Sequence, residues 1–201
     1  LHCAGPFSAT APQAMAACIS AGVHYLDITG EIDAFVAAQA RQTDAEQANI
    51  VICPGVGFDV IPTDCIAARL KQELPDADRL ALGFDSRSAL SPGTAKTSVE
   101  GLKYGGRIRK DDRIVSVPLA YQSREIDFGN GTKHAVTIPW GDIATAWFSP
   151  GIDHIEVFLP MAPSAATRLR RLDRLRPLLG LPPVQALLKY LVARRITGPD
   201  S

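Results

Sequence analysis

The strongest constraint on the fold of this chain is a pair of apolar segments that each end in a glycine-containing turn and lead directly into a helical segment. Residues 25–28 are followed by Thr29-Gly30-Glu31, and residues 49–53 are followed by a turn at 54–60. The chain opens in the same manner, with an apolar start and a turn before a helical segment. This alternation predicts a parallel sheet with right-handed crossovers over residues 1 to about 74.

The helices expected between these strands have recognisable ends. A first helix is predicted over residues 13–21 and should end at Gly22, because glycine is common at helix C-termini. Ser8 or Thr10 is its expected N-cap, and Pro12 falls in its first turn, where a missing N–H costs little. The two helices that follow are expected over residues 31–47 and 62–74.

From about residue 77 the pattern changes to β-hairpins. Asp111-Asp112 and Gly129-Asn130-Gly131 are turn sequences between segments that read as strands. A run of strands after βαβ units indicates a mixed α+β domain, so we predict one domain over residues 1–76 and a second over 77–201. The expected elements of the second are strands at 78–85, 107–110, 114–117, 120–128, 133–138 and 152–159, a loop at 88–93 and a helix at 94–104.

The C-terminal segment combines arginine with leucine. Helices are predicted over residues 167–179 and 184–196. A leucine at every third position of the first helix favours packing against protein, either the sheet of the second domain or another subunit. Contact with an anionic membrane surface is the less favoured alternative. The residues concerned are Arg168, Arg170, Arg171, Arg174 and Arg176, with Leu169, Leu172, Leu175 and Leu178.

Composition disfavours several classes of function. The chain has 201 residues, of which 46% are apolar, and its formal net charge is zero. Nucleic-acid-binding proteins usually carry a basic surplus, so we expect no nucleic-acid partner. The four cysteines are widely spaced and show no zinc-ligand spacing, so no metal site is expected. With neither a signal peptide nor an apolar run of membrane-spanning length, the chain is expected in the cytoplasm.

Candidate ligand-binding residues lie in the turns after the predicted strands. In an open α/β sheet the carboxyl ends of the strands form the edge where ligands bind. Glycines there would let a ligand approach the backbone, whereas Asp27 or Thr29 could instead cap the following helix. No GxGxxG fingerprint, nucleophile elbow or triad spacing is present, so no catalytic residue is predicted. The candidates are Asp27, Thr29, Gly30, Gly57, Phe58 and Asp59.

Other polar residues near helix starts have less specific roles. Asp142 and Thr145 lie near the start of a short helical segment and could face a cleft. Asp64 is expected to complement the dipole of the helix over 62–74. Trp140 and Trp147 are expected to pack in the core.

Several short motifs occur together in this chain. Together they resemble the saccharopine-dehydrogenase-like oxidoreductases, and within them the group that includes the trans-acting enoyl reductases. The resemblance covers nearly the whole chain, and the combination is specific although each motif alone is not. The motifs are Cys3-Ala4-Gly5-Pro6-Phe7, Tyr25-Leu26-Asp27-Ile28-Thr29-Gly30-Glu31, Pro54-Gly55-Val56-Gly57-Phe58-Asp59 with Pro62-Thr63-Asp64, Gly93-Thr94-Ala95 with Glu100-Gly101, and Pro139-Trp140-Gly141-Asp142.

The resemblance implies a nicotinamide cofactor, NADP or NAD. Ala4, Gly5, Pro6 and Phe7 would lie near the dinucleotide, and the turns at 27–31 and 54–59 would lie near its nicotinamide end. The implied fold is α/β, the C-terminal part of a Rossmann-like parallel sheet followed by a mixed α+β domain. The half that carries the phosphate loop is not in this sequence, so we expect the chain to be a fragment that is inactive alone.

Two functions remain open from the sequence. The first is a part of an NAD(P)-dependent oxidoreductase that transfers hydride between the nicotinamide and a carbonyl, imine or activated alkene of a small-molecule or acyl substrate. The second is a binding or scaffold protein that retains the fold without turnover, because such a fold does not determine function. An upstream strand with a Gly-rich phosphate loop would favour the enzyme. Whether the protein forms a homodimer is left open.

Overall fold

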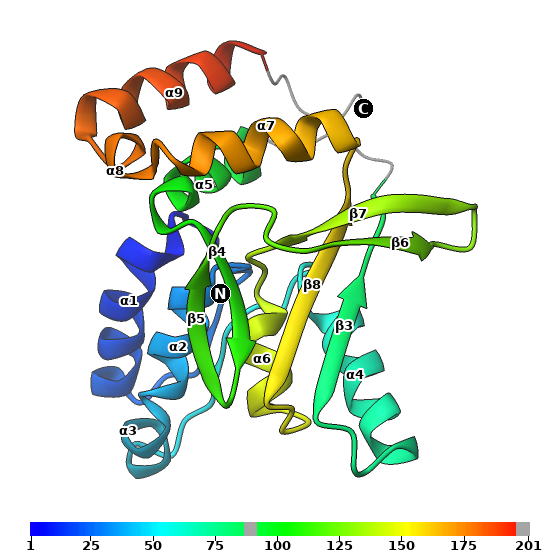
Figure 1. The fold of residues 1–201 in the computed structure, drawn as a ribbon. Helices are drawn as coiled ribbons and strands as arrows, with labels where there is room; N and C mark the ends of the chain where they lie inside the picture. The colour runs from blue at the N-terminus through cyan, green and yellow to red at the C-terminus, as the bar shows by residue number, and fades with distance from the viewer. Residues whose placement is uncertain (87–91, 196–201) are drawn as a thin grey trace. The chain divides into compact units, whose positions relative to one another are not determined.

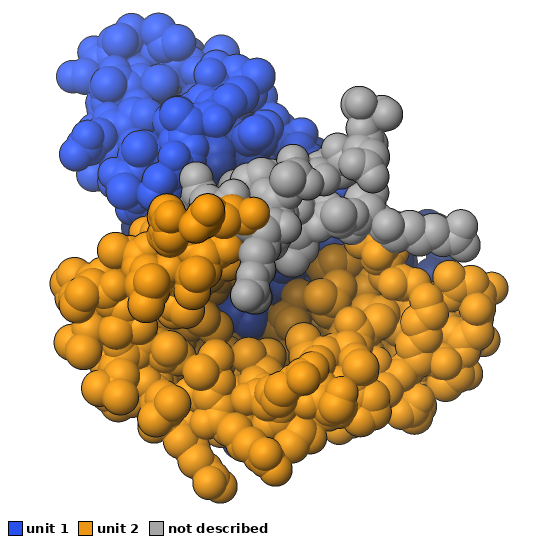
Figure 2. Space-filling model, turned by 90° about the horizontal axis from the view of Figure 1, so that it is seen from above, with its two compact units in different colours: residues 1–80, 109–114, 139–155 blue, residues 81–108, 115–138, 156–201 orange. Residues whose placement is uncertain are grey.

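The computed structural model describes residues 1–86 and 92–195, and it divides into two compact units. Unit 1 comprises Leu1–Leu80, Arg109–Ile114 and Pro139–Ile155. Unit 2 comprises Ala81–Ile108, Val115–Ile138 and Glu156–Ser201 (Figure 2). Unit 1 therefore contains the predicted first domain and also two later segments of the chain. Most of the predicted loop at 88–93 lies outside the described residues.

Unit 1 begins with the predicted alternation of strands and helices. Strands β1 and β2 pair in parallel, with Tyr25 opposite Ile52 and Leu26 opposite Cys53, and His2 forms a further parallel bridge with Asp27. The predicted parallel sheet is thereby confirmed. Its elements are α1 (Phe7–Ala21), β1 (Tyr25–Leu26), α2 (Ile32–Gln39), α3 (Gln42–Gln47), β2 (Ile52–Cys53) and α4 (Ile61–Glu73). The four helices are labelled in Figure 1.

Helix α1 starts earlier than predicted and has a different cap. It begins at Phe7, so Pro12 lies inside the helix. The carboxylate of Glu31 accepts hydrogen bonds from the main-chain N–H groups of Phe7 (2.8 Å) and Ser8 (2.9 Å). The expected cap, Thr10, donates instead to the main-chain oxygen of Ala4 (2.8 Å). A glutamate 24 residues away thus supplies the hydrogen-bond acceptor that a local N-cap side chain would have supplied. At the other end of the helix, the predicted C-cap at Gly22 is confirmed, and this glycine is in the left-handed conformation.

The predicted helix over 31–47 is two helices. Helix α2 ends at Gln39, and α3 begins at Gln42. The apolar face of α2 joins α1 and β1 in a buried cluster of Ala11, Met15, Tyr25 and Ala38. A second cluster joins α4 to α6 (Asp142–Phe148) through Ala67, Ala146, Ile152 and Ile155.

A buried arginine explains why residues 109–114 belong to unit 1. The Nε group of Arg109 donates to the main-chain oxygen of Ile143 (2.8 Å), and its Nη1 group donates to the main-chain oxygen of Asp112 (2.8 Å). Its guanidinium also stacks on Trp147 at 4.6 Å from the ring centroid. This side chain fastens a hairpin turn to α6, and burial lowers its pKa.

The second half of the chain contributes a six-stranded sheet in which the pairs β4–β8, β8–β7 and β7–β6 are antiparallel. The strand order is β5-β4-β8-β7-β6, and β3 also pairs with β8. Both predicted hairpins are confirmed, with positive φ at Asp111 and Asp112 in one turn and at Gly129 and Gly131 in the other. The strands are β3 (Arg79–Gly83), β4 (Gly106–Lys110), β5 (Arg113–Val117), β6 (Ser123–Asp127), β7 (Thr132–Ile138) and β8 (His154–Pro160).

The C-terminal helices bury only part of the leucine stripe. Leu169 packs against Ala120, Val136 and Ala166, as predicted for a core face. Leu175 and Leu178 are exposed, because the first helix ends at Asp173 and a short helix follows it. The helices are α5 (Pro92–Gly101), the 3-10 helix η1 (Leu102–Tyr104), α7 (Pro163–Asp173), α8 (Arg176–Leu179) and α9 (Pro182–Arg195). Within residues 1–86 and 92–195, no helix has both the length and the apolar character needed to cross a membrane.

The Glu31 cap generates a stability prediction. Glu31→Ala leaves the N–H groups of Phe7 and Ser8 without their acceptor, so we expect it to lower the free energy of unfolding by about 1–2 kcal/mol. Urea unfolding followed by circular dichroism measures this change. The matched control is Glu46→Ala, which removes an exposed glutamate bonded only to Gln42. Equal effects of the two variants would contradict a capping role.

Candidate functional site

Three turns that are far apart in the sequence meet in unit 1. We name them turn 1 (residues 27–31), turn 2 (54–60) and turn 3 (139–142). The indole N–H of Trp140 in turn 3 donates to the main-chain oxygen of Asp59 in turn 2 (2.9 Å). A Cβ added to Gly141 would lie 2.6 Å from Val60, 2.7 Å from Phe35 and 3.2 Å from the main-chain oxygen of Gly30. The turns pack so closely that only glycine fits at this position.

The side chain of Asp27 joins turn 1 to turn 2. It is buried, and its Oδ1 atom accepts hydrogen bonds from the N–H groups of Thr29 (2.9 Å) and Gly55 (2.8 Å). Its Oδ2 atom accepts a hydrogen bond from the hydroxyl of Tyr25 (2.7 Å). Burial, followed by this hydrogen bond, raises the pKa of Tyr25. Both carboxylate oxygens are therefore engaged within the protein.

Thr29 has a similar internal role. Its side chain is fully buried, and its hydroxyl oxygen accepts a hydrogen bond from the N–H group of Glu31 (3.0 Å). This bond stabilises the entry to α2 and sets the position of the glutamate that caps α1. Both side chains therefore bond main-chain groups of the turns, but neither is the predicted cap of the following helix: the N-cap residue of α2 is Glu31, and no side chain caps it. A contact of Asp27 or Thr29 with a cofactor stays a prediction.

The other predicted residues are more accessible. Ala4, Gly5 and Pro6 are exposed, and Phe7 and Gly57 are partly exposed. Phe58 is 87% exposed, which is unusual for a phenylalanine in a well-packed turn. A Cβ added to Gly30 would lie 2.5 Å from Oδ2 of Asp59, so this carboxylate rests directly on turn 1. Desolvation at this position raises the pKa of Asp59.

The last residue of turn 3 carries a buried carboxyl. Asp142, the first residue of α6, is fully buried, and its Oδ1 atom accepts a short hydrogen bond from the hydroxyl of Thr63. The Oδ2 atom of Asp142, Oδ1 of Asp64 and Oγ1 of Thr145 are buried and have no hydrogen-bond partner among the described residues. The pKa of Asp142 is raised to about 6, chiefly by burial; hydrogen bonds from Thr63 and from the main chain oppose the rise, and the nearby Asp64 and Asp59 carboxylates add to it. The idea that Asp142 faces a cleft is wrong.

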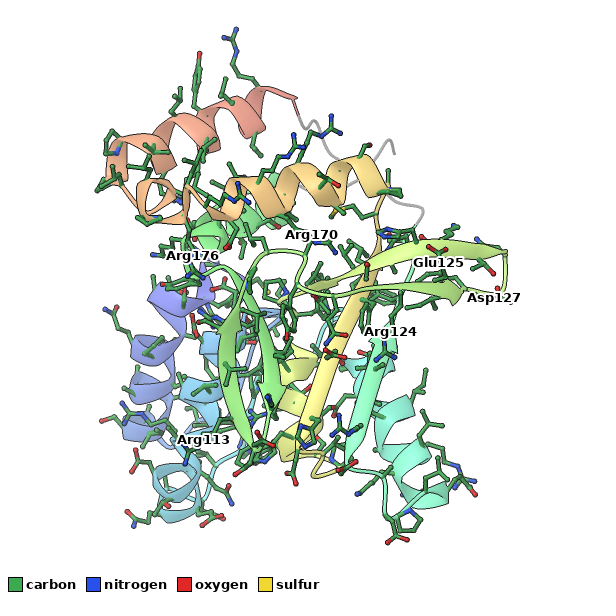
Figure 3. All side chains as sticks on the ribbon, in the orientation of Figure 1. Arg113, Arg124, Glu125, Asp127, Arg170 and Arg176 are labelled. Carbon is green, nitrogen blue, oxygen red and sulfur yellow. The ribbon has the colours of Figure 1, made fainter. Side chains whose placement is uncertain are left out.

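Unit 2 has a groove of its own. It has a volume of 710 Å³ and is lined by the end of β3 with Phe84 and Asp85, and by β6 with Phe128. Arg124, Glu125 and Asp127 are labelled on β6 in Figure 3. Ion pairs brace the groove, from Lys133 to Asp85 (2.6 Å) and from Arg124 to Glu156 (3.5 Å). In the part of the chain that the structure describes, no group of three His, Cys, Asp or Glu side chains could hold a metal ion.

Comparisons with known proteins find similarity in sequence and in fold. No protein-family model matches the chain. The chain is 30% identical over 118 residues to a protein of Arabidopsis thaliana named "Probable mitochondrial saccharopine dehydrogenase-like oxidoreductase", with 55% of this chain and 26% of that protein covered. It also matches the structure of apo saccharopine dehydrogenase (L-Glu forming) from Saccharomyces cerevisiae. That match has a TM-score of 0.50 at 12% identity and covers 81% of this chain and 40% of the yeast chain.

The resemblance to the saccharopine dehydrogenase-like family is confirmed. The low identity to the yeast structure makes that second match evidence for the fold alone. The chain spans about a quarter of the plant relative and two fifths of the yeast enzyme. The likeness to enoyl reductases, the choice of NADP over NAD and the cytoplasmic location stay predictions, and the plant relative is named as mitochondrial.

Sequence reasoning identified residues 139–142 as a motif but did not place them beside turns 1 and 2. Turn 3 is held in place because Gly141 packs on Phe35 and Val60. These two residues come more than 80 positions earlier, and nothing in the sequence indicates the contact. Phe58 was found as a candidate, but its exposure was not predictable because the pattern of a turn does not show which side chain points outward.

The two glycines of turn 2 differ in the space available for a side chain, and this difference allows a matched test. Gly55 has a φ of +70°, and an added Cβ would lie 2.6 Å from the Phe35 ring. Gly55→Ala should therefore lower the free energy of unfolding by about 2–4 kcal/mol through backbone strain and overpacking. At Gly57 the nearest atom to an added Cβ is 3.4 Å away, so Gly57→Ala is the control. Chemical denaturation of both variants checks the difference, and similar losses would contradict this packing.

The raised pKa of Asp142 makes stability depend on pH. An unfolded aspartate has a pKa near 3.9, so the folded state binds the proton more tightly. Stability is therefore highest when Asp142 is protonated and falls as pH rises from about 4 to about 6. We expect Asp142→Asn, which keeps an acceptor for Thr63, to gain about 3 kcal/mol relative to the natural chain over this range. Thermal melting across pH 4–8 measures the difference, and parallel profiles would refute it.

Proposed function

We propose that this chain is part of an NAD(P)-dependent oxidoreductase that transfers hydride between a nicotinamide and a carbonyl, imine or activated alkene of a small-molecule or acyl substrate. The observation that carries the proposal is the parallel pair β1–β2 with turns 1 and 2 at its carboxyl ends. Sheets of this kind bind ligands at that edge. The name of the plant relative supports an oxidoreductase activity, and the match to the yeast structure supports the fold.

The exposed residues of unit 1 fit the nicotinamide end of the cofactor. A nicotinamide ring is flat, and the exposed Phe58 ring offers a surface on which such a ring can stack. The Asp59 carboxylate, held beside Gly30, is an acceptor for a ribose hydroxyl. We assign direct contacts to Ala4, Gly5, Pro6, Phe58 and Asp59, and we assign the shape of the turns to Phe7, Asp27, Thr29, Gly30 and Gly57.

The N-terminus of α1 does not fit the pyrophosphate. Helix N-termini commonly bind phosphate, but the N–H groups of Phe7 and Ser8 already donate to Glu31. A second anion there would meet a carboxylate. The pyrophosphate must therefore be held by other groups, and this chain would supply the part of the site around the nicotinamide and its ribose.

Asp59 is the first candidate for handling a proton at this edge. When bound, the cofactor supplies the hydride donor or acceptor, so the protein must position it, exclude water and move protons. The raised pKa of Asp59 lets its carboxyl hold a proton closer to neutral pH than an ordinary aspartate does. Asp142 has a raised pKa as well, but it is buried and its contacts lie within the fold.

Phe58 provides the test of this proposal. In the full-length protein we expect Phe58→Ala to weaken NADPH or NADH binding at least about tenfold, equivalent to about 1.4 kcal/mol of lost contact. Titration of cofactor fluorescence measures the affinity. The control is Phe148→Ala, which removes another exposed phenylalanine of unit 1 at the end of α6.

The outcomes separate the competing functions. Unchanged affinity in Phe58→Ala would refute the site assignment. Cofactor binding without turnover of any carbonyl, imine or alkene substrate would favour a binding or scaffold protein that retains the fold. No binding of either nicotinamide cofactor would refute the oxidoreductase proposal.

A further inference from the structure

The C-terminal helices of unit 2 present an apolar surface that nothing in the described chain covers. Leu187 and Tyr190 on α9 are 57% and 56% exposed, and Leu175 and Leu178 are 50% and 53% exposed. Leu181, between α8 and α9, and Leu191 are exposed as well. All of these side chains belong to α8, α9 and the segments next to them, and the two helices pack against each other. Large exposed apolar groups in one place usually mark a surface that binds something.

The orientation of α9 is fixed by its inner face. Gln185 donates from Nε2 to the main-chain oxygen of Val99 (3.1 Å), and Lys189 pairs with Glu100 (2.5 Å). These contacts hold α9 on α5. Residues three and four apart share a helix face, so Leu187, Tyr190 and Leu191 lie together on the opposite side.

This segment is also strongly basic, although the chain as a whole is neutral. Residues 163–195 contain eight arginine or lysine residues and one acidic residue, Asp173. Asp173 points inward, where its Oδ1 atom accepts from the N–H group of Leu119 (3.1 Å). The acidic group thus does not neutralise the outer face of α7.

The arginines divide between the two faces of α7 and α8. Arg170 donates from Nε to the main-chain oxygen of Ala120 (2.7 Å), and Arg176 lies against Gly105, so both are used within unit 2 (Figure 3). Arg168, Arg171 and Arg174 are exposed, and no ion pair within the described residues involves them. Arg168 and Arg171 lie one turn apart on α7, Arg174 follows at its C-terminal end, and exposed Leu175 and Leu178 come next in the chain.

We propose that the outer face of α7–α9, which we call the C-terminal surface, docks on an anionic lipid bilayer. Leucine and tyrosine side chains suit the boundary between headgroups and acyl chains, and arginines suit lipid phosphates. The protein would lie on the membrane surface, in agreement with the lack of a spanning helix among the described residues. The sequence alone favoured packing of the leucines against protein over contact with a membrane. Because the structure leaves Leu175 and Leu178 exposed, we now favour the membrane.

A second copy of the chain fits this surface less well. A twofold dimer places the same patch on both subunits, so the exposed arginines of one copy would face those of the other. No exposed acidic residue of residues 163–195 is present to pair with them. A nucleic acid would satisfy the arginines but would leave the leucines in water.

Co-sedimentation of the full-length protein with vesicles tests the proposal. We expect binding to phosphatidylcholine vesicles that contain phosphatidylserine, weakening with added salt, and little binding to phosphatidylcholine alone. The combined variant Arg168→Gln, Arg171→Gln, Arg174→Gln should lose at least about tenfold in affinity. The variant Leu187→Ser, Leu191→Ser tests the apolar contribution, and its affinity for the same vesicles should fall by a similar factor.

A matched charge control keeps the experiment specific. The variant Arg69→Gln, Arg79→Gln, Arg113→Gln removes three exposed arginines outside this surface and should bind vesicles like the natural protein. In Tyr190→Trp, the tryptophan fluorescence should shift to shorter wavelength on anionic vesicles, which reports insertion of α9 independently of the loss variants. Equal loss in the control, equal binding to neutral vesicles, or no binding at all would overturn the proposal. Dimerisation abolished by the leucine variant would also overturn it, in favour of a protein partner.

Discussion

The buried carboxylate of Asp27 is the interaction on which the candidate site depends. Its two oxygens accept three hydrogen bonds, from the N–H groups of Thr29 and Gly55 and from the Tyr25 hydroxyl. A buried donor that loses its acceptor costs about 1–3 kcal/mol, so one side chain holds two turns and a strand in a single arrangement. Because Thr29 in turn holds Glu31, the start of α1 depends on the same turn.

This dependence explains how an exposed aromatic ring can be held in a defined position. Phe58 itself makes little contact with the fold, but the residues beside it do. Gly55 is bonded to Asp27, and the main-chain oxygen of Asp59 is bonded to Trp140. A turn whose backbone is already anchored needs little further ordering when a ligand covers it, which favours binding. Burial of Asp27 and exposure of Phe58 are therefore two parts of one arrangement.

Features encoded by neighbouring residues were predictable from the sequence. The parallel strands, the left-handed Gly22 at the end of α1 and the two hairpins follow from residues within a few positions of each other. Features that depend on distant contacts were not predictable. The start of α1 depends on Glu31, and the membership of 139–155 in unit 1 depends on the fit of Gly141 between Phe35 and Val60. A pattern of residue types along the chain does not show which distant residues come together in space, so neither contact could be predicted.

The C-terminal surface shows why net charge was a poor guide to partners. The basic segment 163–195 is balanced by acidic residues elsewhere, so the sum over the chain is zero. At physiological ionic strength a charge is screened over about 8 Å, so a docking partner responds to the side chains it touches rather than to the total. The arginines at 168, 171 and 174 therefore act as a local basic patch. They share no residue with turns 1 to 3, so the proposed membrane docking and the proposed cofactor binding can be tested separately by mutation.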